Sequence, residues 1–178
     1  MRALIGCLAL VAACDGGSAI KPPPPPSRDG GTYLLTLGTA DAEGNWLPLV
    51  DGQDVTLVEG AQGGFHVWMK IRTQGMPDQQ IAIAKTAHKV ATDQLVLRSM
   101  AAAEIMPTGP SETWEIPTAF PMFMCPSPVG ISVIDTLISY EIGLSNIDGT
   151  DELCHAAITL IPHCPIDQKD FCERICTG

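Results

Sequence analysis

The chain has 178 residues, of which 20 are acidic and 10 basic, and its formal net charge is −10. This length accommodates one ordinary domain with flanking signals, and a composition that is 46% hydrophobic and 17% charged is typical of a folded chain. The acidic excess repels phosphate backbones and the basic residues are scattered, so nucleic acid is not expected as a partner.

Residues 1–13 have the three parts of a secretory signal peptide. Met1 and Arg2 form a short positive start, 3–13 is an uncharged and mostly apolar run, and small residues lead into Cys14. A membrane-spanning helix needs about 20 apolar residues, and this run is shorter. We therefore expect a cleaved signal rather than a permanent anchor.

The sequence Val11-Ala12-Ala13-Cys14 resembles the lipobox of bacterial lipoproteins, in which an aliphatic and two small residues precede a modified cysteine. The resemblance implies cleavage before Cys14 and lipidation of Cys14. It also implies a cell-envelope location, anchored by lipid to the inner or outer membrane, with the domain facing the periplasm or the cell surface. A secreted protein without lipid is the alternative. A second match ending at Cys7 would leave too short a signal, so Cys7 is assigned to the apolar run.

Residues 14–31 are expected to form a tether. Five consecutive prolines, Pro22 to Pro26, favour an extended polyproline II rod of about 3.1 Å per residue. Such a rod would space the following domain from a bilayer.

Residues 32–164 carry short runs in which apolar and polar residues alternate between glycine and proline breaks, a pattern typical of strands. In the clearest run Phe65, Val67, Met69 and Ile71 point to one side, expected to be core, and the intervening residues to the other, expected to face water. All the expected strands are 32–37, 54–59, 65–72, 80–90, 94–100, 113–116, 136–144 and 153–162.

These strands predict an all-β fold, an antiparallel immunoglobulin-like β-sandwich, with a closed barrel as the alternative. Asn146 to Asp151 supplies the turn residues of a hairpin. The oxygens of Asn146, Asp148, Asp151 and Glu152 could also bind calcium, although they do not follow the twelve-residue loop pattern.

Five cysteines follow Cys14, and export to an oxidising compartment predicts disulfides. Five choices of the unpaired cysteine and three connectivities for the other four allow 15 arrangements. Cys154 shares a strand face with apolar residues and is expected to be the buried free thiol. The disulfide candidates are Cys125, Cys164, Cys172 and Cys176.

The cysteine-rich tail, 165–178, is expected to contain a short helix capped by Asp167. Cys172 and Cys176 lie one helical turn apart, on one face. We therefore expect them to bond outward, one to Cys164 and the other to Cys125, with the pairing left open.

The outward row of the clearest strand, His66, Trp68, Lys70 and Arg72, is the candidate surface for a protein or glycan partner. Scattered surface aromatics are the plainer interpretation. A copper site is a further alternative on ligand type alone. Its candidate ligands are Met122, Met124, Cys154, His155, His163 and Cys164.

The copper candidates do not follow a known spacing, so neither metal nor cofactor is expected. There is no Gly-x-Ser-x-Gly or His-Glu-x-x-His motif, and the glycines of 60–64 lead into a strand rather than a phosphate-binding helix. We therefore expect a non-catalytic binding or structural module.

Several segments resemble a group of uncharacterised Gram-negative lipoproteins. They are Asp51-Gly52-Gln53-Asp54-Val55, the run from Gln62 to Trp68, Cys125-Pro126-Ser127-Pro128 and the cysteine tail. The likeness covers most of the mature domain and implies no particular activity.

Overall fold

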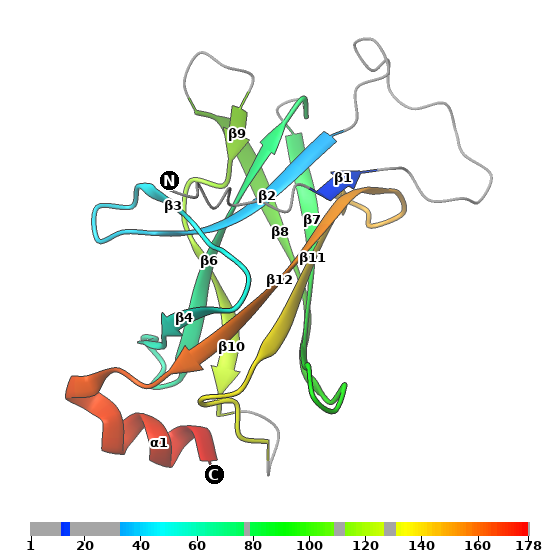
Figure 1. Ribbon diagram of the computed structural model, residues 1–178. Coiled ribbons are helices and arrows are strands. Elements are labelled where there is room, and N and C mark those ends of the chain that lie inside the picture. Colours follow the sequence, from blue (N-terminus) through cyan, green and yellow to red (C-terminus); the bar gives the residue numbers. More distant parts are fainter. Residues whose placement is uncertain (1–11, 15–32, 77–78, 109–112, 127–130, 178) are drawn as a thin grey trace, which may run out of the picture.

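The computed structural model describes residues 12–14, 33–76, 79–108, 113–126 and 131–177 (Figure 1). Most of the expected signal peptide and all of the tether after Cys14 therefore lie outside the described residues. Within these ranges, every strand but a short one at Ala12–Cys14 lies between Tyr33 and His163, and one α-helix follows them. The predicted all-β fold, an antiparallel sandwich with a disulfide-linked tail, is confirmed.

The first layer is built around β6, which pairs with strands on both of its sides. All of the pairs in this layer are antiparallel. Its strands are β2 (Tyr33–Ala40), β3 (Trp46–Pro48), β5 (Val58–Glu59), β6 (Phe65–Gln74), β9 (Thr113–Glu115) and β10 (Phe120–Cys125).

The second layer has the order β8-β7-β11-β12-β4. Three of its pairs are antiparallel, whereas β4 runs parallel to β12. Its strands are β4 (Gln53–Thr56), β7 (Gln79–Lys89), β8 (Leu95–Pro107), β11 (Ile138–Asn146) and β12 (Glu152–His163).

The two layers are joined through β8, so hydrogen bonding continues from one to the other in an open, folded sheet. The strand pairs with β7 from Leu95 to Ile105 and with β9 at Met106 and Pro107. On the other side of the sandwich β2 lies against β12 (Figure 1). A further strand, β1 (Ala12–Cys14), pairs antiparallel with β2.

The core lies between the layers and follows the predicted alternation. Phe65, Val67, Met69 and Ile71 of β6 are all buried, and the second layer contributes alternate residues of β11 and β12. The hydroxyl of Tyr140, on β11, donates to the sulfur of Met124, on β10, at 3.0 Å. Both side chains are fully buried, so this contact links the two layers inside the core.

Two strands, β3 and β10, are not predicted by the sequence pattern. Pro121 argues against a strand in β10, because proline has no N–H for the ladder. The structure accommodates it because, among the described residues, β10 pairs only with β6. The expected strand 54–59 is also divided into β4 and β5 at Leu57, which is fully buried and donates its N–H to the His163 carbonyl.

The tail forms a 3₁₀ turn, η2 (Ile166–Gln168), followed by α1 (Lys169–Thr177). Asp167 lies inside η2, which begins after Pro165 with no side-chain cap, so the predicted capping role of Asp167 is wrong. The helix packs against β6 and β10 at one end of the sandwich (Figure 1). It buries Cys172 and Cys176 on its inner face.

Candidate functional site

The outward row of β6 does not form the open surface that the alternation predicts. Lys70 is only 2% exposed. Its ammonium lies 3.2 Å from Glu115 Oε1 and 3.0 Å from the Gly44 carbonyl oxygen. The prediction of a solvent-facing Lys70 is therefore wrong, because β9 and the β2–β3 hairpin cover this part of the strand.

Arg72 binds the same carboxylate as Lys70, that of Glu115, and the three side chains form one charged cluster. Its Nε and Nη2 lie 3.2 and 3.0 Å from Glu115 Oε2, and its guanidinium carbon lies 4.4 Å from the centre of the Trp46 ring. Gly38 makes this arrangement possible, since a Cβ there would come within 2.6 Å of the Trp46 ring. Lys70 and Arg72 thus both bind Glu115 within the fold, and only Arg72 keeps part of its side chain exposed.

His66 and Trp68 lie together at the other end of the row. Their ring centres are 5.9 Å apart, and the His66 ring lies 5.1 Å from that of Phe123, on β10. Burial lowers the pKa of His66, so its ring is neutral at pH 7. Among the described residues no group hydrogen-bonds to the buried Nδ1 of His66 or Nε1 of Trp68.

Trp68, a member of the predicted row, borders a cleft. This cleft has a volume of about 530 Å³ and lies between the end of β2, β4, β5 and β6. Its polar lining comes from Thr39, Asp41, Gln53, Asp54 and Thr56. Aromatic, amide, hydroxyl and carboxylate groups around a hollow of this size suit a small polar ligand or part of a peptide or glycan.

The sequence pattern does not predict most of the cleft residues to be part of a binding site. Asp41 lies in the turn before β3, a strand that the pattern does not predict. Gln53 is singled out only as part of a resemblance to other proteins, and Asp54 only by that resemblance and as the start of an expected strand. Both residues are on β4, which pairs in parallel with β12, and sequence alternation does not reveal this pairing.

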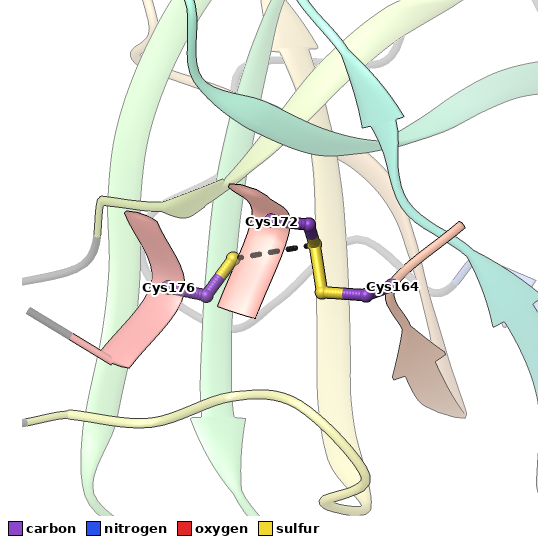
Figure 2. Close-up of side chains that lie close together, drawn as sticks. All are labelled: Cys164, Cys172 and Cys176. Atoms are coloured by element: carbon purple, nitrogen blue, oxygen red, sulfur yellow. Dashed lines mark hydrogen bonds between the residues drawn. A yellow bond between two sulfur atoms is a disulfide. The ribbon is translucent and has the colours of Figure 1, made fainter. Parts of the chain in front are cut away.

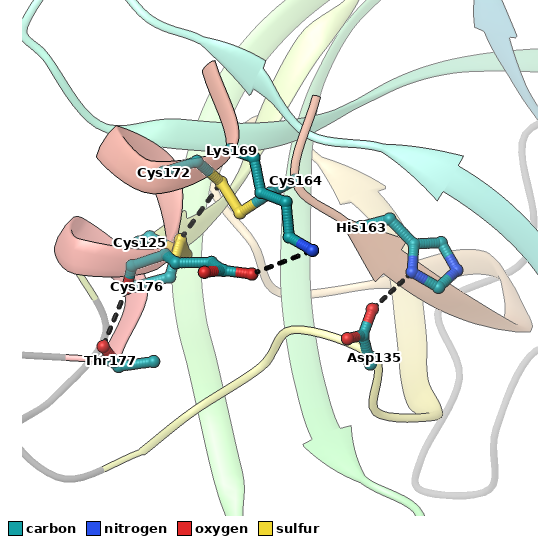
Figure 3. The surroundings of a disulfide bond; sticks show 9 residues. Cys125, Asp135, His163, Cys164, Lys169, Cys172, Cys176 and Thr177 are labelled. Atoms are coloured by element: carbon teal, nitrogen blue, oxygen red, sulfur yellow. Dashed lines mark hydrogen bonds and ion pairs between the residues drawn. A yellow bond between two sulfur atoms is a disulfide. The ribbon is translucent and has the colours of Figure 1, made fainter. Parts of the chain in front are cut away.

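Asp54, on one wall of the cleft, also belongs to a bridge in which His163 lies between two carboxylates. His163 Nε2 lies 2.7 Å from Asp54 Oδ1. On the other side of the ring, His163 Nδ1 contacts Asp135 Oδ1, as Figure 3 shows. The hydrogen bond with Asp54 and then that with Asp135 raise the pKa of His163. The bridge ties β4 and the loop before β11 to the end of β12.

The four disulfide candidates form two bonds. Cys125 bonds to Cys176 and Cys164 to Cys172, and Cys154 is a buried free thiol. Both bonds tie α1 to the sandwich, as expected for outward bonding of Cys172 and Cys176. The sulfurs of Cys172 and Cys176 lie 3.9 Å apart, so the two bonds form one sulfur cluster (Figure 2).

The copper candidates are not brought together. Met122 and Met124 lie in the core, and Met124 accepts the Tyr140 hydrogen bond. His155 pairs with Glu152 on the surface at 2.9 Å. Cys164 is in a disulfide and has no thiolate to offer.

The calcium candidates Asn146, Asp148 and Asp151 form hydrogen bonds within their own turn. Asn146 Oδ1 accepts from the Asp151 N–H, and Asn146 Nδ2 donates to Asp151 Oδ2. Asp148 Oδ1 accepts from the N–H and hydroxyl of Thr150. The predicted hairpin turn between β11 and β12 is present and accounts for these side chains.

No protein-family model and no curated protein sequence matches this chain. Within the described ranges, no helix is long and apolar enough to cross a membrane.

Proposed function

We propose that this chain is a lipid-anchored lipoprotein of the bacterial cell envelope, and that its β-sandwich is a non-catalytic binding or structural module. The observation that carries the proposal is the sequence Val11-Ala12-Ala13-Cys14 at the end of a short apolar run. Two disulfides support it, since such bonds persist in oxidising compartments outside the cytosol. Two or three acyl chains on Cys14 would give stable attachment, at about 0.8 kcal/mol per buried methylene.

Labelling with radioactive palmitate tests the anchor. Cys14→Ala should abolish the label and remove the protein from the membrane fraction, because it removes the acylated sulfur. Cys7→Ala is the matched control and should retain both. Unchanged labelling of the Cys14→Ala protein would contradict the proposed anchor.

The cleft beside Trp68 supports a binding role, because it combines an aromatic wall with hydrogen-bonding side chains. Val58 lines the cleft and is 50% exposed, whereas Val50 is 56% exposed and lies outside it. Val58→Arg should fill the cleft without disturbing the core, and Val50→Arg is its matched control.

A panel of soluble cell-wall glycan and peptide fragments is the probe for this role, with ligand-induced changes in NMR spectra as the readout. Binding that is lost in Val58→Arg and kept in Val50→Arg would support the module. Binding that both variants retain would place the site elsewhere.

A copper-handling lipoprotein is the alternative, motivated by the sulfur and imidazole residues of the sequence. The side-chain arrangement does not favour it, because the candidate ligands lie in the core, in disulfides or in ion pairs. Titration of the purified, oxidised protein with copper separates the two hypotheses. Stoichiometric binding would overturn our choice.

A further inference from the structure

The longest of the described strands, β8, has an open edge. From Leu97 to Ile105, β8 pairs with β7 in regular register. On the opposite side of this stretch, no strand pairs with it anywhere in the part of the chain that the structure describes, since the pairing of β8 with β9 begins only at Met106. The stretch contains no proline, glycine or lysine, which are common protections of exposed edges.

The side chains along this edge are accessible. The outward row, at alternate positions from Arg98 to Glu104, is exposed throughout, and Met100 is 66% exposed. Ala101, which points to the other side of the sheet, is exposed as well. A second strand can therefore approach β8 without displacing core side chains.

The order of the exposed residues is complementary to itself. In an antiparallel pair centred on Ala101, Arg98 of one strand lies opposite Glu104 of the other, and Met100 lies opposite Ala102. Opposite charges at facing positions stabilise a strand pair, and like charges destabilise it. Among the described residues neither Arg98 nor Glu104 has an ion-pair partner within its own chain.

Other registers lose this complementarity. A shift of two residues along the strand places Arg98 opposite an alanine or a methionine, and an in-register parallel pair brings like charges together. The register centred on Ala101 also ends before Met106, where β9 occupies the edge.

We propose that β8 is a self-association edge, at which two copies of this chain pair antiparallel about Ala101 and extend the second layer into one sheet across both. The symmetry makes the interface isologous. One Arg98–Glu104 contact lies at each end of an apolar centre, and the two contacts are identical. The partner is a second copy because the edge carries both halves of the charge pair.

Charge exchange tests the partner and the register. Sedimentation of the full-length protein in detergent should show a dimer for the wild type. Arg98→Glu and Glu104→Arg should each weaken dimerisation by at least about tenfold, because each places like charges opposite one another. Mixing the two variants should restore a dimer, and so should combining both substitutions in one chain.

Matched controls carry the same charge changes elsewhere on the surface. Arg174→Glu on α1 and Glu43→Arg in the β2–β3 turn alter exposed residues outside β8 and should dimerise as the wild type does. A monomeric wild type, a dimer that both single exchanges leave intact, or single variants that fail to associate when mixed would overturn the proposal.

Cross-linking in intact membranes tests the centre of the pair. The Cα atoms of facing residues in an antiparallel pair lie about 4.5 or 5.5 Å apart, which a disulfide can span. Ala101→Cys should therefore give a covalent dimer on non-reducing gels. Ala103→Cys should not, because its copies would be about 13 Å apart along the strands. Equal cross-linking at both positions, or more at 103, would exclude this register.

Discussion

Lys70 and Glu115 form a buried ion pair on the side of β6 that faces away from the core, with 3.2 Å between Nζ and Oε1. Glu115 also accepts from Arg72, so one carboxylate compensates two cations. The cluster holds β9 and the turn before β3 against β6. The cluster therefore stabilises the fold on a side of β6 that the sequence pattern predicts to face water.

Glu115→Ala should destabilise the protein by about 3 kcal/mol or more, because it leaves the Lys70 ammonium buried without a counter-charge. The free energy of unfolding in urea is the measurement. Glu43→Ala, in an exposed turn, should change it by less than about 0.5 kcal/mol. A loss below 1 kcal/mol for Glu115→Ala would mean that water reaches Lys70 and compensates its charge.

The two disulfides should contribute unequally. The Cys125–Cys176 bond closes a loop of 51 residues and the Cys164–Cys172 bond one of 8. Chain entropy then assigns about 4 kcal/mol to the first and about 2.5 kcal/mol to the second. Thermal unfolding of the paired alanine variants should show the larger loss for Cys125→Ala with Cys176→Ala. Equal losses, or the reverse order, would show that loop entropy does not govern these bonds.

His163 should make stability depend on pH. Its hydrogen bonds with Asp54 and Asp135 raise its pKa above the ordinary 6.5. The contribution is therefore fully present below about pH 6.5 and lost as the pH rises through the folded-state pKa. The cost of His163→Gln should be greater at about pH 5.5 than at about pH 9, and His88→Gln is the control. A cost independent of pH would contradict the charged bridge.

NMR titration can measure the pKa values of His66 and His163, which should shift in opposite directions. The pKa of His163 should lie above 6.5 and that of His66 below it, because burial disfavours the protonated His66 ring. Protonation of His66 at low pH therefore opposes folding, and that of His163 favours it. A His66 pKa at or above 6.5 would show that solvent reaches the ring.

Gly64 should not tolerate a side chain. A Cβ at this position would lie 2.6 Å from the carbonyl oxygen of Cys125, at the close approach of β6 and β10. Gly64→Ala should cost about 1–3 kcal/mol in unfolding experiments. Gly143→Ala is the matched control, because its Cβ would meet only Ala84, at 3.8 Å, and alanine suits a strand better than glycine. A neutral Gly64→Ala would mean that the two strands separate easily.

Local patterns predict much of the fold. The two-residue period of β6 identifies its buried face, and the turn residues from Asn146 to Asp151 identify the β11–β12 hairpin. Strands β3 and β10 are missed because one is three residues long and the other contains Pro121. The position of β3 depends on its hairpin pairing with β2, and that of β10 on pairing with β6, which is distant from it in sequence.

The site is less predictable because its groups come from separate parts of the chain. Lys70 meets Glu115 across 45 residues, and His163 meets Asp54 across 109. Strand alternation specifies which side of a sheet a residue occupies but not what covers that side. Residue type and strand alternation single out Trp68, whereas the polar residues around it come from β2, the turn after it and β4.

The Cys125–Cys176 bond also determines how the protein responds to mechanical load. The β11–β12 hairpin lies entirely within the loop that this bond closes. Tension between the first strand and the C-terminus therefore passes from β10 to α1 through the sulfur atoms and bypasses the hairpin. At about 3.5 Å per residue, the closed loop withholds about 180 Å of extension from a stretched chain. Two of the five strands of the second layer can thus stay paired while the strands before Cys125 are pulled apart.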